Sequence, residues 1–446
     1  MRDGNDYPTL KLYFESKGFH FTDEQIFAFY NALKTKGFLI LAGLSGTGKT
    51  KIAQLFADLL GKEKEDDENE FLCFLSVRPD WRDSTSLLGY YNPITEKYQS
   101  TPLLKFILRA SNDLQNPYFL ILDEMNLAHV EYYFADFLSV LESGRETNGF
   151  TKEEIQLHSK GETVKDEEGN DIPNEIKLPP NLFIIGTVNI DETTYMFSPK
   201  VLDRAFTIEF RDVDLESYPS QSATEICDEQ KNELKEAILE DLRNNGKFYV
   251  FTKDDIKKAI DKLGNFKEEL KELNDALLPY DLGFGYRVVD EIALLVYLAK
   301  EPKDFLPSFG EEKAKDLAVL MKVLPKFHGP KAKLEKPLVE VLKWCRAPQQ
   351  ESAEDKQKSK ENTPEGQPET EEGRENAHSQ GGKKEAPTLE KEIKGIFEIK
   401  EEIDLRHYIR DWKKEGLEKR FKYPLTAKKV TEMLARLYEI GFTSFM

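Results

Sequence analysis

One loop, GLSGTGKT at Gly43–Thr50, constrains the fold of this chain more than any other feature. It fits the pattern G-x-x-x-x-G-K-[ST], and it stands between a short apolar run, FLILAG, and the helical stripe of KTKIAQLFADLLG. Glycine permits a backbone path whose N–H groups converge on a phosphate, and the N-terminus of the next helix adds a favourable dipole. The sequence therefore predicts a phosphate-binding strand–loop–helix unit.

The loop residues predict how a nucleoside triphosphate is held. We expect Lys49 to reach the β- and γ-phosphates and the Thr50 hydroxyl to bind Mg²⁺. A chance match in a glycine-rich turn is the alternative, and the flanking strand and helix weigh against it. The predicted nucleotide-binding residues of the loop are Gly43, Ser45, Gly46, Thr47, Gly48, Lys49 and Thr50.

Two acids end the apolar run YFLILDE, which predicts a buried strand over 118–124. Beside a phosphate loop, we expect Asp123 to hold Mg²⁺ through water and Glu124 to orient or deprotonate the attacking water. An acid pair that only caps a helix is the weaker alternative here. Asn126 either helps to position the water or forms a turn, and the sequence leaves both open.

Five apolar runs separated by helical stretches predict an α/β fold, with a mostly parallel sheet covered by helices on both faces. Asn189 ends the fourth run and is a candidate sensor of the γ-phosphate, with an Asx turn as the alternative. Arg204 and Arg287 are candidates for neutralising γ-phosphate charge, with exposed ion pairs as the alternative. The predicted strands cover residues 38–43, 71–77, 118–124, 182–190 and 204–210.

Composition changes along the chain predict its division. Two alternating segments around a Gly/Asn/Asp-rich turn predict an inserted β-hairpin, and a later stretch with almost no apolar side chains predicts disorder. The predicted parts are a helical lead-in at 1–36, an α/β nucleotide-binding domain at 37–214 with the hairpin at 150–180, an α-helical lid at 215–348, a disordered acidic linker at 349–388 and a C-terminal helical segment at 389–446.

The composition of the 446 residues narrows the class of protein. The net charge of −19 argues against a surface coated in positive charge for nonspecific nucleic-acid binding. The three cysteines form no CxxC pair and the six histidines show no metal-ligand spacing, so a disulfide scaffold or a zinc site is not expected. No apolar run approaches the length of a membrane span, so we expect no membrane contact and a cytoplasmic location.

Several longer segments make the chain resemble the AAA+ superfamily and, within it, the McrB family, the nucleotide-driven subunit of McrBC methylation-dependent restriction systems. The resemblance covers nearly all of 20–346 and the tail from about 422. The segments that carry it are RPDWRDSTSLLGYYNP, LDEMNLAHVEYYFADFLSVLE, GTVNIDETTYMFSPKVLDRAF, FGYRVVDEI, VLPKFHGPKAKLE and GFTSF.

The resemblance implies roles for individual residues. Asp123 and Glu124 match the Walker B acids, and Asn126 matches the asparagine that follows them. Asn189 matches sensor 1, Arg204 the arginine finger given to the neighbouring subunit, and Arg287 sensor 2 of the lid. The hairpin at 150–180 resembles the insertion that points into the pore of the ring.

The resemblance also implies an activity. It implies an AAA+ P-loop NTPase that forms a homo-oligomeric, hexameric ring and couples hydrolysis to translocation of methylated DNA with an McrC-like nuclease subunit. The family signature has Met at the position of Val188 and Asp at that of Glu192. This departure leaves GTP or ATP open as the substrate. The alternative is a protein-remodelling ATPase similar to MoxR chaperones, with no DNA role.

Overall fold

The computed structural model describes residues 8–61, 69–190, 195–211, 226–346, 389–397, 405–410, 412–413 and 416–446. The predicted linker at 349–388 and the signature position 192 lie outside these described residues. The chain divides into two compact units. One is Met1–Gly329 with Ser444–Met446, and the other is Pro330–Thr443.

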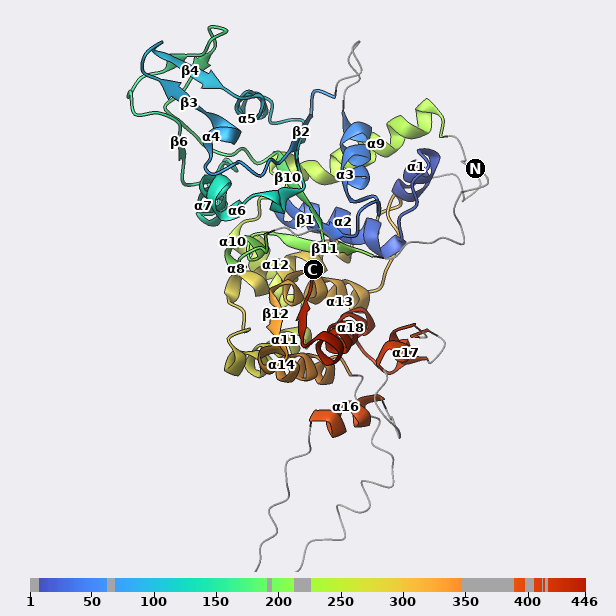
Figure 1. Cartoon of the computed structure of the whole chain (residues 1–446). Coiled ribbons are helices and arrows are strands. Elements are labelled where there is room, and N and C mark those ends of the chain that lie inside the picture. The colour runs from blue at the N-terminus through green and yellow to red at the C-terminus, as the bar shows by residue number, and fades with distance from the viewer. Residues whose placement is uncertain are drawn as a thin grey trace, which may run out of the picture. The chain divides into compact units, whose positions relative to one another are not determined.

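A five-stranded sheet forms the centre of the first unit, in the order β11-β1-β10-β5-β2 (Figure 1). All four neighbouring pairs are parallel, which confirms the predicted α/β fold. Each predicted strand is present and differs by at most two residues at an end. The strands are β1 Phe38–Gly43, β2 Leu72–Ser76, β5 Tyr118–Asp123, β10 Leu182–Asn189 and β11 Phe206–Phe210.

Local signals in the sequence set the ends of the helices. The Thr22 side chain accepts a hydrogen bond from the Gln25 N–H while the Gln25 side chain accepts one from the Thr22 N–H, so the two residues form a capping box at the start of α2. Gly37 ends the same helix with a φ of 70°. The α-helices of this unit are α1 Leu10–Ser16, α2 Asp23–Lys36, α3 Lys49–Leu60, α4 Thr85–Leu88, α5 Pro102–Asn112, α6 Val130–Tyr133, α7 Ala135–Glu142, α8 Pro199–Leu202, α9 Asp228–Arg243, α10 Lys253–Asp261, α11 Phe266–Leu277, α12 Tyr286–Ala299 and α13 Glu311–Lys322.

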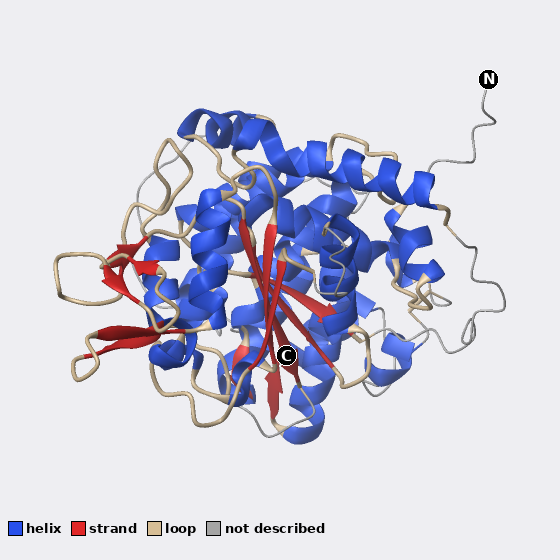
Figure 2. Cartoon of the chain, turned by 90° about the horizontal axis from the view of Figure 1, so that it is seen from above, coloured by secondary structure: helices blue, strands red, loops and turns tan. Residues whose placement is uncertain are grey.

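Helices cover both faces of the sheet at its central strands (Figure 2), whereas Phe74 of the edge strand β2 is exposed. Successive side chains of a strand point to opposite faces. On one face, Leu120 and Ile184 belong to a buried cluster with side chains of α5 and α7. On the other face, the ring of Phe119 meets Phe56 of α3 and stacks on Phe183, with centroid distances of 5.7 and 5.3 Å. Burial on both faces explains why these strands are continuous apolar runs.

The segment predicted as one hairpin holds two short antiparallel pairs, β6 Ile155–Gln156 with β9 Glu175–Ile176, and β7 Val164–Lys165 with β8 Asp171–Ile172. The sequence reasoning missed a further hairpin, β3 Gly89–Asn92 with β4 Lys97–Ser100. Its strands are too short and too polar to show a clear alternation.

The helices after the sheet do not form one lid over 215–348. The division at Gly329 places α14 Lys331–Trp344 in the second unit, where it packs against α18 Pro424–Ile440. The apolar faces of the two helices pack against each other, so segments that the predicted linker separates in the sequence are in contact. The other helices of this unit are α16 Leu389–Phe397 and α17 Leu405–Arg410. The short strands β12 His328–Pro330 and β13 Phe442–Ser444 lie where the chain passes between units.

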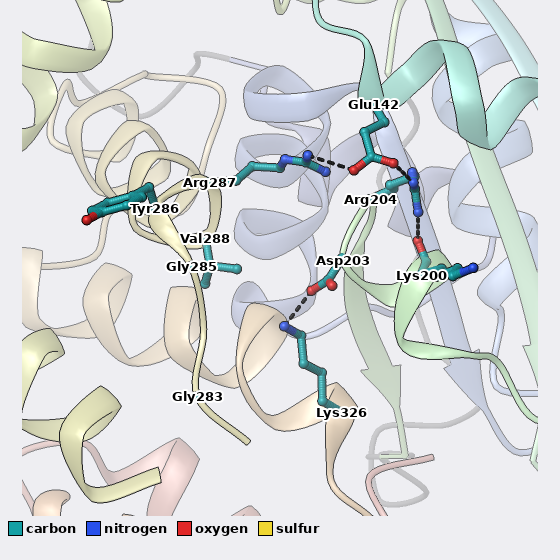
Figure 3. A pocket seen from close by; sticks show the side chains of 10 residues that line it. All are labelled: Glu142, Lys200, Asp203, Arg204, Gly283, Gly285, Tyr286, Arg287, Val288 and Lys326. Atoms are coloured by element: carbon teal, nitrogen blue, oxygen red, sulfur yellow. Dashed lines mark hydrogen bonds and ion pairs between the residues drawn. The ribbon is translucent and has the colours of Figure 1, made fainter. Parts of the chain in front are cut away.

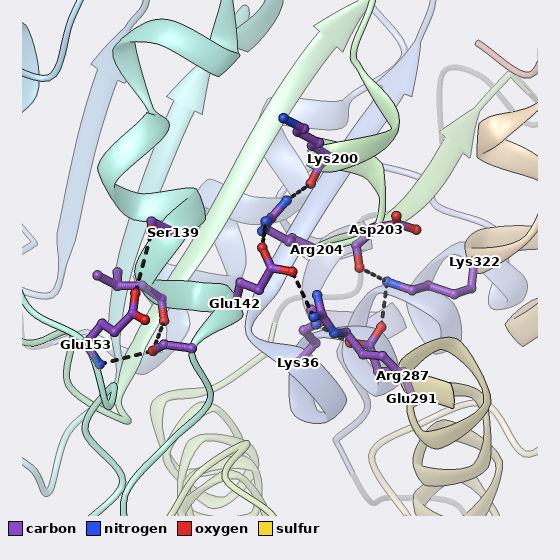
Figure 4. A network of polar contacts seen from close by, with 12 residues as sticks. Lys36, Ser139, Glu142, Glu153, Lys200, Asp203, Arg204, Arg287, Glu291 and Lys322 are labelled. Carbon is purple, nitrogen blue, oxygen red and sulfur yellow. Dashed lines mark hydrogen bonds and ion pairs between the residues drawn. The ribbon is translucent and has the colours of Figure 1, made fainter. Parts of the chain in front are cut away.

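A buried ion cluster joins α2, α12 and α13 of the first unit (Figure 4). Glu291 of α12 pairs with Lys36 at the end of α2 and with Lys322 of α13, the latter at 2.5 Å. Burial would raise the pKa of Glu291, but the two lysines outweigh it and lower that pKa. Burial lowers the pKa of Lys322 to about 8 although Glu291 opposes the shift. Glu291 and Lys322 are therefore both charged at neutral pH, and each stabilises the charge of the other.

Replacing Glu291 by glutamine should destabilise the first unit by about 3–5 kcal/mol, because it leaves the buried ammonium of Lys322 and the partly buried ammonium of Lys36 without their shared counter-charge. Chemical denaturation followed by circular dichroism measures the change. Glu272→Gln, at an exposed position of α11, is the matched control and should stay within about 0.5 kcal/mol of the parent chain. Equal effects of the two substitutions would contradict the importance of the cluster.

Candidate functional site

The phosphate loop begins where β1 ends in the middle of the sheet. Gly43 lies between Asn189 of β10 and Phe210 of β11. A Cβ on Gly43 would lie 2.1 Å from the Phe210 carbonyl oxygen, so no larger residue fits without moving the backbone. Gly46 and Gly48 have φ values of 80° and 88°, a region that favours glycine. The sequence pattern and the backbone geometry of the loop therefore agree.

Two side chains of the loop have defined positions. Lys49 is buried, and its Nζ donates to the carbonyl oxygens of Gly43 and Leu44, at 3.0 and 2.5 Å. Thr50 Oγ1 donates to Asp123 Oδ1 at 2.8 Å. Strand β5 thus brings its terminal acid to the first turn of α3, although 73 residues separate the two partners along the chain.

Thr187 is a site residue that the sequence reasoning missed. Its Oγ1 donates to Asp123 Oδ1 at 2.7 Å and accepts from the Glu124 N–H at 3.0 Å. A single hydroxyl of β10 therefore contacts both the Asp123 carboxylate at the end of β5 and the backbone of Glu124, which follows it. The signal was present two residues before Asn189, as a polar residue inside an apolar strand.

The second acid has an unusual backbone. Glu124 adopts φ 54° and ψ 47°, which is costly for a residue with a side chain and is typical of functional sites. Its Oε1 accepts a hydrogen bond from Asn189 Nδ2 at 3.1 Å. Asn126 is buried in the short helix Met125–Leu127 that follows, and its carbonyl oxygen accepts from the Tyr195 N–H at 3.0 Å. The carboxylate of Glu124 is thus held at the carboxyl edge of the sheet.

The donor set at this edge fits a hydrated Mg²⁺. Thr50 offers a hydroxyl and Asp123 a carboxylate, the hard oxygen ligands that Mg²⁺ takes together with phosphate oxygens and water. Among the residues that the structure describes, no group of three or more His, Cys, Asp or Glu side chains could hold a metal by itself. A magnesium ion here would depend on a bound triphosphate to complete its ligands.

Arg204 lies at the amino edge of the sheet, where the strands begin, and the phosphate loop lies at the carboxyl edge, where they end. Arg204 precedes β11 by two residues, and Phe206 pairs with Leu39 near the start of β1, whereas the phosphate loop follows Gly43 at the end of β1. The four steps from Leu39 to Gly43 alone span roughly 13 Å at about 3.3 Å per residue. The Arg204 side chain also contacts Glu142 and the carbonyl oxygen of Lys200 at this edge. The structure therefore does not bring Arg204 to the phosphate loop of the same chain.

Arg287 lies beside Arg204. It stands in the first turn of α12, and Glu291 of the same helix contacts Lys36, which lies two residues before the start of β1. Arg287 Nη2 donates to Glu142 Oε1 at 3.1 Å, and Arg204 Nη2 pairs with Glu142 Oε2 (Figure 3). Glu142 of α7 therefore bridges both guanidinium groups.

The two arginines line a pocket of about 630 Å³. Four cationic and two acidic side chains contribute to its wall, so its lining is net positive. Burial, and then the charge of Arg287, lowers the pKa of Arg204. Such a pocket suits an anion that brings more charge than Glu142 supplies. Its lining residues are Glu142, Lys200, Asp203, Arg204, Gly283, Gly285, Tyr286, Arg287, Val288 and Lys326.

Replacing Gly43 by alanine should destabilise the first unit by about 1–3 kcal/mol, because the new Cβ forces β1 and β11 apart. Thermal or chemical denaturation measures the loss. Gly310→Ala is the control, because its Cβ meets open space and its φ is −68°. At Gly310, alanine is a weaker helix cap, which lowers the free energy of unfolding, but it also makes the unfolded chain less flexible, which raises it. The two effects roughly cancel. A stability of Gly43→Ala equal to the control would contradict the close approach.

Similarity to known proteins was found in one family model and among solved structures. A model described as a domain of unknown function (DUF8727) matches residues 239–442. No curated protein matches the chain. A solved structure of a "putative ATPase" from Cytophaga hutchinsonii is similar over 71% of this chain and 85% of that chain, at 14% identity and a TM-score of 0.39. Within the described ranges, no helix has both the length and the apolar character of a membrane crossing. The parallel five-stranded sheet and the glycine-rich loop between β1 and α3 make this an α/β fold of the P-loop type.

Proposed function

We propose that the chain is a nucleoside triphosphatase that works as a ring of identical subunits, each completing the active site of its neighbour. One observation carries this proposal. The phosphate loop and the acid pair lie at the carboxyl edge of the sheet, whereas Arg204 and Arg287 lie at the amino edge. One subunit cannot bring both sets to one phosphate, but two subunits placed edge to edge can.

The residues at the carboxyl edge divide the work of hydrolysis. Lys49 and the loop amides hold the phosphates, and Thr50 and Asp123 hold the magnesium ion. That ion neutralises charge on the β- and γ-phosphates when it is bound. Glu124, held by Asn189, orients or deprotonates the attacking water. The arginines of the next subunit neutralise the charge that develops on the γ-phosphate, and either GTP or ATP serves this chemistry.

We further propose that the ring is of McrB type, hexameric, and that it moves methylated DNA with a separate McrC-like nuclease subunit. The segments RPDWRDSTSLLGYYNP, GTVNIDETTYMFSPKVLDRAF and GFTSF support this reading, because together they are more specific than the phosphate loop alone. The net charge of −19 favours the alternative, a MoxR-like ATPase that remodels protein clients.

Mixing two inactive variants should restore hydrolysis. An arginine finger contributes about 10³–10⁵ in rate, so Arg204→Ala should nearly abolish turnover, and Glu124→Gln should do the same through loss of the base. In mixed rings, some junctions pair an intact Glu124 with an intact Arg204 on the adjacent subunit. About a quarter of junctions in random one-to-one rings have this pairing. Steady-state phosphate release measures the recovery.

The control replaces the Glu124→Gln partner by a chain that carries both substitutions. Mixed rings of that double variant with Arg204→Ala contain no intact junction and should stay inactive. Absence of rescue in the first mixture, in rings shown to contain both chains, would contradict an active site shared between subunits.

Stimulation of turnover separates the two functional classes. With Mg–GTP or Mg–ATP, methylated duplex DNA together with the nuclease subunit should raise the rate of phosphate release above that of the ring alone. Unmethylated DNA of the same sequence is the control. A rate that responds to an unfolded or assembled protein client, and not to DNA, would favour the chaperone class instead.

A further inference from the structure

Glu142 occupies the centre of the arginine pocket. Its two carboxylate oxygens contact different guanidinium groups, Oε2 with Arg204 and Oε1 with Arg287 (Figures 3 and 4). Arg204 also donates to the Lys200 carbonyl oxygen. The carboxylate therefore stands where an oxyanion between the two arginines would stand.

The position of Glu142 in its helix is unfavourable by itself. Glu142 is the last residue of α7, where the carbonyl end of the helix carries partial negative charge. An acidic side chain there is stabilised only by nearby cations, and here the two arginines are those cations. The local sequence of α7 thus gives no reason for an acid at this position, and the arginine pair gives one.

The exposures of the three side chains show which of them can move. The Arg204 side chain is only 10% exposed, and its contact with Lys200 holds it independently of Glu142. The Glu142 and Arg287 side chains are 48% and 43% exposed. Glu142 can therefore swing into solvent while Arg204 stays in place.

We propose that Glu142 is an internal anion that keeps the guanidinium groups of Arg204 and Arg287 in position. It competes for them with the terminal phosphate of a nucleotide carried by another copy of this chain. This inference rests on the proposed function. A terminal phosphate carries up to about two negative charges and three acceptor oxygens, against one charge and two oxygens for the carboxylate. The phosphate displaces Glu142 when subunits meet with nucleotide bound, and hydrolysis and phosphate release return the arginines to Glu142. Glu142 is thus a positioning residue that sets how readily subunits assemble.

Nucleotide-dependent assembly tests the competition. The experiment uses the full chain with Glu124→Gln, so that bound GTP or ATP persists, and measures by sedimentation velocity the protein concentration at half-maximal assembly. Adding Glu142→Gln should lower this concentration roughly tenfold, the difference between a charged and a neutral hydrogen-bond partner. Glu142→Asp, which keeps the charge, should return the midpoint towards that of the Glu124→Gln chain.

Two controls separate the competition from a general effect of charge. Glu153→Gln removes an acid whose Oε2 lies 3.5 Å from the Ser139 hydroxyl of α7, the helix that ends at Glu142. Glu153 contacts neither arginine in Figure 4, so this substitution should not shift the midpoint. In a chain that also carries Arg204→Ala, the shift caused by Glu142→Gln should shrink strongly. A general relief of net negative charge would instead give the same shift with both glutamines.

The outcomes distinguish this inference from the proposed function. If Arg204→Ala weakens assembly and the mixing experiment restores turnover, but Glu142→Gln leaves the midpoint unchanged or raises it, the competition is wrong and the shared active site stands. If Arg204→Ala leaves assembly unchanged and mixing restores nothing, the shared site is wrong, and the role of Glu142 is overturned with it.

Discussion

The common direction of the five strands is the constraint on which the rest of the site depends. Because every strand of the sheet runs the same way, the residues that follow β1, β5 and β10 meet at one edge, and the residues that precede β11 lie at the other. Asp123, Thr50 and Asn189 come together for this reason alone. Arg204 is kept from them for the same reason, so the candidate site residues of a single chain are divided between two edges of the sheet.

Buried polar contacts keep these two edges in register with the helices around them. At the carboxyl edge, the Thr187 hydroxyl ties Asp123 to the backbone of Glu124. At the amino edge, Lys322 contacts Glu291 and also donates to the carbonyl oxygens of Asp203 and Ala205, on either side of Arg204. A displacement of α12 or α13 would therefore also move the backbone on either side of Arg204, because buried ion pairs tolerate little displacement.

Much of the fold could be predicted because its signals are local. The apolar runs predicted the five strands, and the loop pattern predicted the position of α3. Thr187 and Glu142 were missed although each lies in a segment that carries the resemblance, because their partners are more than 60 positions away along the chain. The position of α14 with the C-terminal helices was missed for the same reason, because packing across a long linker leaves no local trace.

The amino-acid sequence by itself determined the backbone path of the phosphate loop, since Gly46 and Gly48 adopt positive φ values for local steric reasons. It also determined the α/β alternation, because burial on both faces requires continuous apolar strands. Only the tertiary structure decided that Arg204 and Arg287 share one pocket, on the far side of the sheet from that loop. Strand direction and helix packing set this, and both depend on contacts between residues that the chain itself keeps far apart.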